Sequence, residues 1–147
     1  MAPIPGPRPI ERILLATDLS HASDGASDEA IQLARALNAE LLAVSVIDGV
    51  QPAAFERQLG RMDQRRAARE LAAQALVIRG RRAGVQTSFL VWEGDPGPAI
   101  VEAARAEHAD LVVVGTRGRN RLERAVLGSV SDHVVRNAHC PVLIVRA

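Results

Sequence analysis

The amino-acid sequence predicts an α/β fold: an open, five-stranded parallel sheet with helices on both faces, of the Rossmann-like kind. Short, continuous apolar runs alternate with helical segments along the chain, which is typical of strands buried on both faces and joined by crossover helices. Hydrophobic residues make up 48% of the chain and aromatic residues 2%, so we expect a core of small aliphatic side chains, which suits such a sheet. The 147 residues are enough for one domain, expected at residues 10–147.

Five apolar runs are predicted to be the strands of this sheet. They cover residues 10–17, 41–47, 85–92, 111–114 and 141–145. Asp18 follows the first run and Asp48 follows the second. In a sheet of this kind, ligands bind outside the carboxyl ends of the strands, where the strand order reverses. The loops after Ala16, Val46 and Val114 are therefore expected to form a ligand site.

A helix is predicted in each of the four connections between strands. Ser20 is expected to cap the first helix. The second is a long helix, rich in arginine and alanine, over residues 55–82. Asp95 is expected as the N-cap of the third, with Pro96 at its first helical position. The last helix is short and covers residues 129–137.

Charge and composition exclude several classes of partner. The 18 basic and 17 acidic residues give a net charge of +1, so no overall field attracts nucleic acid or an anionic membrane. No apolar run approaches the ~20 residues that span a bilayer. Every second residue from Pro3 to Pro9 is a proline, so we expect residues 1–9 to form a flexible tail. This segment lacks the apolar core of a signal peptide, so we expect a cytoplasmic protein. The single cysteine, Cys140, excludes an internal disulfide.

A glycine-rich loop follows the fourth predicted strand. Gly115 and Gly118 are separated by two residues, and Gly128 follows after nine more, directly before Ser129. Glycines allow sharp turns and let a ligand approach main-chain N–H groups. A helix that opens at residues 128–129 adds free N–H groups and a dipole that favour an anion, and Ser131 adds a second hydroxyl. The loop therefore has the features of a phosphate-binding site.

From spacing alone, a purely structural interpretation of this loop stays open. Gly115 then ends a strand and Ser129 belongs to a helix cap, both of which are common. Two familiar phosphate motifs are excluded: the Walker A loop needs a lysine, and the chain has none. A dinucleotide fingerprint of spaced glycines belongs after the first strand, where residues 16–20 contain no glycine.

Taken together, these segments resemble the universal stress protein family over nearly the whole chain, from Ile10 to Val145. The most specific match is the pattern Gly-x2-Gly-x9-Gly-Ser, the mark of the family's ATP-binding branch, which runs here from Gly115 to Ser129. The family has an adenine nucleotide alpha hydrolase-like fold. The other matching segments are residues 17–20 at the first strand end, residues 45–48 at the second, residues 94–96 at the third turn, and residues 140–145 in the closing strand.

The resemblance implies a site for ATP. Asp18 would lie beside the adenosine, Ala16 and Thr17 would line the pocket, and Val46 would meet the adenine edge through its backbone. Mg²⁺ would accompany the phosphates, which would be its main ligands. The residues implied to wrap the ribose and phosphates are Gly115, Arg117 and Gly118, and those implied to donate to the phosphate oxygens are Gly128, Ser129, Val130 and Ser131.

The resemblance also implies a homodimer through the last strand, from Pro141 to Val145. We expect a nucleotide-dependent regulatory module of the stress response. A slow ATPase or phosphotransferase, and an interaction module that binds no nucleotide, are the alternatives. Hydrolysis is expected to be slow because Glu123 is the only carboxylate from Gly115 to Ser131, and it lies among arginines.

A row of arginines in the long helix invites a second interpretation. Arg57, Arg61, Arg65 and Arg69 recur every four residues, which would suit an acidic partner. Acidic residues lie among them, so a solvated helix face is the favoured interpretation.

Overall fold

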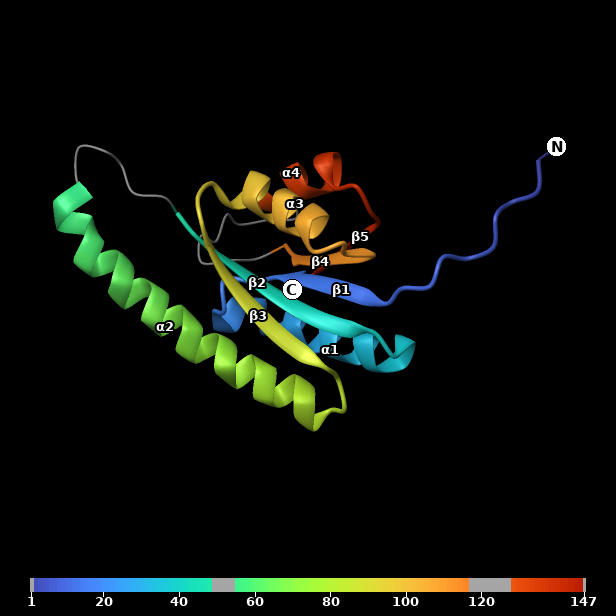
Figure 1. Cartoon of the computed structure of the whole chain (residues 1–147), viewed down its shortest axis with the longest axis horizontal. Coiled ribbons are helices and arrows are strands. Elements are labelled where there is room, and N and C mark those ends of the chain that lie inside the picture. Colours follow the sequence, from blue (N-terminus) through green and yellow to red (C-terminus); the bar gives the residue numbers. More distant parts are fainter. Residues whose placement is uncertain (1, 49–54, 117–127, 147) are drawn as a thin grey trace.

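The computed structural model describes residues 2–48, 55–116 and 128–146, without the side chains of residues 55–63. It contains one five-stranded sheet in which every neighbouring pair of strands is parallel. The strands are β1 (Arg12–Ala16), β2 (Glu40–Ile47), β3 (Thr87–Glu93), β4 (Leu111–Gly115) and β5 (Val142–Val145), and the sheet order is β3-β2-β1-β4-β5 (Figure 1). The predicted fold class is confirmed.

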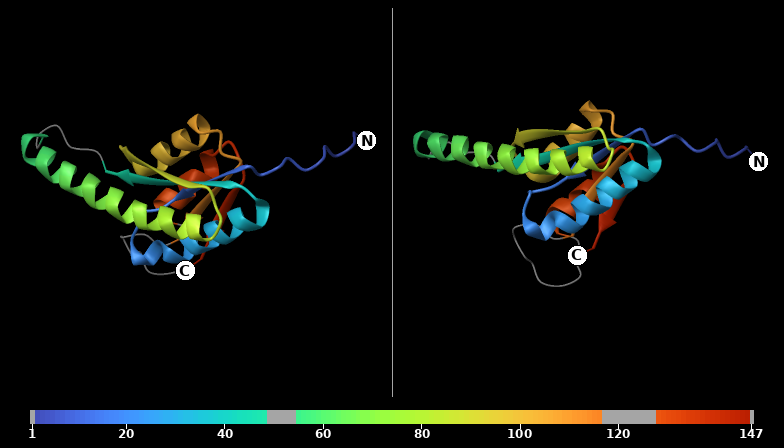
Figure 2. Two further views of the ribbon diagram at one scale, coloured as in Figure 1. Left: turned by 60° about the horizontal axis from the view of Figure 1, so that its bottom comes forward. Right: turned by 90° about the horizontal axis from the view of Figure 1, so that it is seen from below.

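In the described part of the chain, four α-helices connect successive strands and form two layers. They are α1 (Asp24–Leu37), α2 (Phe55–Arg82), α3 (Pro96–Ala106) and α4 (Ser129–Asn137). α1 and α2 pack on one face of the sheet, whereas α3 and α4 pack on the other (Figure 2). The bounds of α2 and α4 agree with those predicted. Ala2–Pro9 are exposed and lead away from the sheet (Figure 1).

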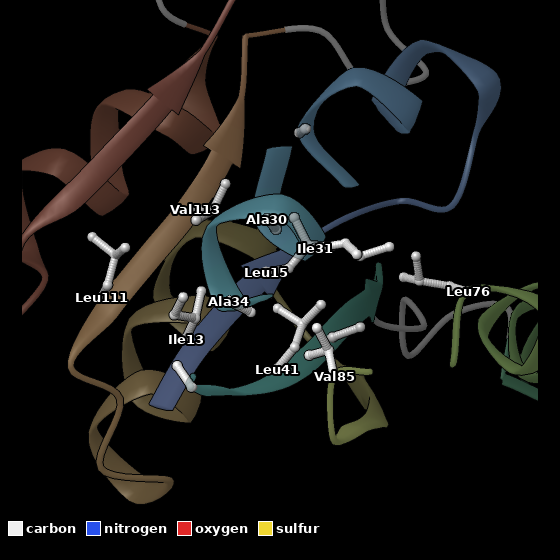
Figure 3. Packing of buried hydrophobic residues seen from close by; sticks show 13 residues of the cluster. Ile13, Leu15, Ala30, Ile31, Ala34, Leu41, Leu76, Val85, Leu111 and Val113 are labelled. Atoms are coloured by element: carbon white, nitrogen blue, oxygen red, sulfur yellow. The ribbon is translucent and has the colours of Figure 1, made fainter. Parts of the chain in front are cut away.

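Each face of the sheet has its own hydrophobic core. Under α1 and α2, Ile13, Leu15 and Val113 of the central strands pack against small residues of α1, such as Ala30 and Ala34 (Figure 3). The cluster on the other face is likewise aliphatic and joins the central strands to α3 and α4. Alanines in the helices allow close approach to the sheet, so few aromatic side chains are needed.

Two local expectations for the helices are wrong. Ser20 does not cap α1, because a short 3₁₀ turn, His21–Ser23, intervenes and α1 begins at Asp24. Arg69 does not belong to a solvated arginine face: it is buried, and its guanidinium donates to the hydroxyl of Ser45 in β2. Among the described residues, no helix has the length and apolar character needed to cross a membrane.

Candidate binding site at the carboxyl ends of the strands

The strand order reverses at β1, whose two neighbours are β2 and β4. The chain leaves β1 toward β2 and later returns to β4 on the other side, so the topological switch point lies beyond the end of β1. The register of β1 and β2 ends at Ala16 and Val44, whereas β2 continues to Ile47. β2 therefore projects past the end of β1.

Val46 lies on this projecting part of β2. The amide of Thr17 donates to the carbonyl of Val44 at 3.0 Å, so the backbone polar groups of Val44 face β1. Alternate residues of a strand point the same way, so the N–H and C=O of Val46 also face the β1 side, beyond the last paired residue of β1. This is the geometry that backbone recognition of a flat ring requires, and the side chain of Val46 is half-buried.

The turn after β1 is held by its own polar side chains. The hydroxyl oxygen of Thr17 accepts a bond from the amide of Leu19 at 3.0 Å and pairs with the hydroxyl of Ser23 at 2.9 Å. One carboxylate oxygen of Asp18 accepts from the amide and the hydroxyl of Ser20, at 3.0 and 2.6 Å. Leu19, between Asp18 and Ser20, has a positive φ of 63°.

The roles of Ser20 and Ser23 in this turn were not predicted. Asp18 followed by Ser20 is compatible with an Asx turn at Asp18, but equally with a helix cap at Ser20. Thr17 is buried and Asp18 is half-buried at the end of β1, next to Ala16. All three lie where a ligand site was predicted.

The start of α4 lies against the end of β4. The hydroxyl of Ser131, which is buried, donates to the carbonyl oxygen of Gly115 at 2.9 Å. Gly128 is the N-cap residue, with extended backbone at φ −60° and ψ 162°. Ser129 and Val130 follow in the first turn and are exposed. The Ser131 bond therefore holds the free N–H groups of this turn at the switch-point edge of the sheet.

Among the described residues, neither the backbone nor packing requires a glycine at position 128. Its φ lies in the ordinary region, and a Cβ atom added there would meet no atom of the described residues within 4 Å. No described residue therefore fills the space where a side chain of residue 128 would lie. Arg117 and Gly118, like Arg119, Arg121, Glu123 and Arg124, lie outside the described residues.

The remaining titratable groups near α4 are engaged elsewhere. Asp132 in the first turn pairs with Arg136 at 3.0 Å, and His133 packs against Gly97 of α3. Burial, assisted by the carboxylate of Asp110, raises the pKa of the Cys140 thiol, so the thiol stays protonated near neutral pH. Among residues 2–48, 55–116 and 128–146, no three His, Cys, Asp or Glu residues gather in a group that could hold a metal ion.

Comparisons with known proteins agree with this architecture. The model of the universal stress protein family matches residues 9–146. A universal stress protein of Methanocaldococcus jannaschii is 37% identical over 147 residues, covering 92% of this chain and 82% of the relative. The structure of a universal stress protein from Lactobacillus plantarum superposes with a TM-score of 0.87 at 26% identity and covers 95% of this chain and 100% of its own.

A further solved structure holds a nucleotide. It is a universal stress protein in complex with cAMP, which is 29% identical to this chain and has a TM-score of 0.72, with 95% of this chain and 98% of that chain covered. The family model spans nearly all of the chain, and the match to the Methanocaldococcus jannaschii relative covers most of that relative's length. The chain belongs to the universal stress protein family.

Proposed function

We propose that this protein binds an adenine nucleotide, with ATP as the expected ligand, and acts as a nucleotide-dependent regulatory module of the stress response. The observation that carries the proposal is the first turn of α4. Its free N–H groups are held against β4 by the bond from Ser131 to Gly115, and no described residue fills the space beside Gly128. Helix N-termini of this kind favour phosphate.

The adenosine is assigned to the crevice beyond β1. The backbone N–H and C=O of Val46 supply one donor and one acceptor on the side of β2 where β1 has ended. This pair complements the amino group and ring nitrogen of adenine. Ala16, Thr17 and Asp18 form the adjoining wall of the site. The turn that contains Asp18 is fixed by hydrogen bonds to Ser20, so the wall is largely preformed.

The phosphates are assigned to the glycine motif. Gly128, Ser129, Val130 and Ser131 would donate to the phosphate oxygens through their N–H groups, and Ser129 also through its hydroxyl, while Gly115, Arg117 and Gly118 would complete the cradle. Mg²⁺, a hard cation, would be held chiefly by phosphate oxygens, because the described residues offer no ready cluster of carboxylates. The cAMP complex of a protein 29% identical to this chain supports an adenine nucleotide in this fold.

A test of the proposal begins with the purified protein. Mass spectrometry of the supernatant after denaturation should detect an adenine nucleotide, and calorimetry on stripped protein should give a dissociation constant for ATP of about 1 to 100 μM. Gly128→Val should abolish binding, because its side chain enters the space that the phosphates need. It should lower the free energy of unfolding by only about 1 kcal/mol, since valine is a poorer N-cap residue than glycine.

Gly6→Val is the control. Gly6 lies in the exposed segment of residues 2–9, which leads away from the sheet (Figure 1), and a Cβ added there also meets no atom of the described residues within 4 Å. It should therefore bind ATP like the wild type. Wild-type affinity in Gly128→Val, with the protein folded, would show that the nucleotide does not bind at this turn.

A further inference from the structure

α2 has a second helical face, which is exposed to solvent and lies beside the face that packs on the sheet. The core-facing positions, among them Ala73 and Leu76, are buried. On the outer side, exposed positions recur at alternating steps of four and three residues, the spacing of a coiled-coil seam. This outer seam consists of Ala67, Leu71, Gln74, Ile78 and Arg81.

The two large apolar side chains of the outer seam are unusually accessible. Leu71 is 70% exposed and Ile78 is 49% exposed. They are separated by two helical turns, so they lie on one line along the helix. Covering such side chains with another protein surface removes apolar area from water and so favours association.

A groove of about 390 Å³ lies beside Ile78, between α2 and the edge strand β3. Its helical lining is formed by Gln74, Val77, Ile78 and Arg81, and β3 contributes Ser88 and Phe89. The four helix positions have the spacing i, i+3, i+4 and i+7. Four residues with this spacing form the hole that receives one knob in a coiled coil.

The knob and the hole occur on the same helix, which makes the surface self-complementary. A second copy of α2, antiparallel and related by a two-fold axis near Gln74, sets its Leu71 opposite the midpoint of Val77 and Ile78. The same axis sets its Ile78 opposite the midpoint of Glu70 and Leu71, in the hole that begins at Ala67. In this one arrangement, Leu71 and Ile78 of each copy each enter one hole on the other copy. We propose that α2 pairs with α2 of a second copy of this chain through the outer seam.

The charges that flank the seam support an antiparallel pair. Glu70 and Arg81 border the two holes on the same side of the helix, and in this arrangement Glu70 of one copy lies beside Arg81 of the other. Within one chain they are eleven residues apart, about 16 Å along the axis, which is too far for an ion pair. Among the described residues, neither side chain has an ion-pair partner. The second copy supplies one for each.

The first test measures self-association of the full chain by sedimentation velocity over a concentration series. Leu71→Glu places charge in the centre of the contact and should raise the dissociation constant of the α2 pair at least about tenfold. Leu37→Glu is the matched control: Leu37 is 42% exposed on α1, away from the outer seam, so this variant should associate like the wild type. Circular dichroism checks that both are folded.

The second test exchanges the charges. Glu70→Arg and Arg81→Glu should each weaken association several-fold, because each places like charges side by side. The double variant should recover wild-type association, which happens only if the two side chains meet between copies. Equal association of wild type and Leu71→Glu would overturn the proposal and leave the groove to a different partner. A double variant as weak as the single ones would overturn the antiparallel arrangement.

Discussion

Two serines in the first turn of α4 have different surroundings. Ser131 is buried and its hydroxyl donates to the carbonyl oxygen of Gly115, so it ties the helix to the end of β4. Ser129, two residues earlier, is exposed on the side of the proposed phosphate site. The sequence predicted that both residues donate to the phosphates. Ser131 uses its one hydroxyl proton on Gly115, which leaves its N–H for the predicted role.

This difference predicts separable effects of two alanine substitutions. Ser131→Ala leaves the Gly115 carbonyl without its donor and should lower the free energy of unfolding by about 1 to 2 kcal/mol. Ser129→Ala should leave stability unchanged and weaken ATP binding by about 1 to 3 kcal/mol, the loss of a bond to a charged acceptor. Urea denaturation measures the first effect and calorimetry the second. A stability loss in Ser129→Ala equal to that in Ser131→Ala would contradict this division.

Single-residue contacts were the hardest to predict from the sequence. The position of Thr17 and Asp18 at the end of β1 follows from the apolar run that precedes them. Their bonds to Ser20 and Ser23 do not, because a serine suits a helix cap and an Asx turn equally well. Only the path of the chain after β1 decides between these two uses.

At the scale of elements, the close approach of α2 to the start of β3 depends on one glycine. A Cβ atom added at Gly80 would lie 2.9 Å from the Cβ of Thr87 and would overlap its hydroxyl oxygen. Thr87 is buried, and its hydroxyl donates to the carbonyl of Val85 at 2.9 Å. The threonine therefore cannot turn aside without loss of that bond.

Gly80→Ala should accordingly destabilise the protein even though alanine is the better helix former. We expect the free energy of unfolding to fall by about 1 to 3 kcal/mol, the usual effect of overpacking. Gly25→Ala in α1, where a Cβ meets nothing, is the control and should be neutral or stabilising. Thermal and urea denaturation compare the two. A Gly80→Ala protein as stable as the wild type would mean that α2 moves away from β3 at little cost.

Element types and their order followed from the sequence, because continuous apolar runs alternate with amphipathic segments. The bounds of α2 and α4 agree with the prediction, since a glycine or a loop interrupts the pattern at their ends. The start of α1 was misplaced, because the 3₁₀ turn His21–Ser23 depends on the contact of Ser23 with Thr17. The outer seam of α2 was not foreseen, because the burial that separates its two faces comes from the fold.

At the scale of the whole molecule, the two edges of the sheet differ in whether another part of the chain covers their outward backbone groups. At the β3 edge, the guanidinium of Arg66 in α2 donates to the carbonyl of Val91 at 3.2 and 3.3 Å. That carbonyl points away from β2, because Gln86 and Gly94 bond to β2 and residues alternate along the strand. Arg66 thus covers an edge group that could otherwise pair with another strand.

The β5 edge has no equivalent cover in the part of the chain that the structure describes. The carbonyls of Pro141 and Val145 accept bonds from β4 and the residue after it, so the backbone groups of Val142 and Ile144 point outward. Their side chains are apolar and half-buried. We therefore propose that residues 141–145 pair with the same strand of a second copy, which covers this edge by two-fold symmetry.

The edge proposal predicts a change in mass when β5 is altered. Ile144→Pro removes an outward N–H that no bond to β4 uses, and should lower the mass of the assembly with only a modest loss of stability. Combined with Leu71→Glu, which removes the α2 contact, it should give a monomer. Val142→Arg should have the same effect through charge on the pairing surface. Val135→Arg is the control, because Val135 is 44% exposed on α4 and takes no part in the edge. Light scattering measures the mass and circular dichroism the fold. A wild-type protein that stays monomeric at tens of micromolar, or a folded Ile144→Pro protein with the wild-type mass, would rule out pairing through β5.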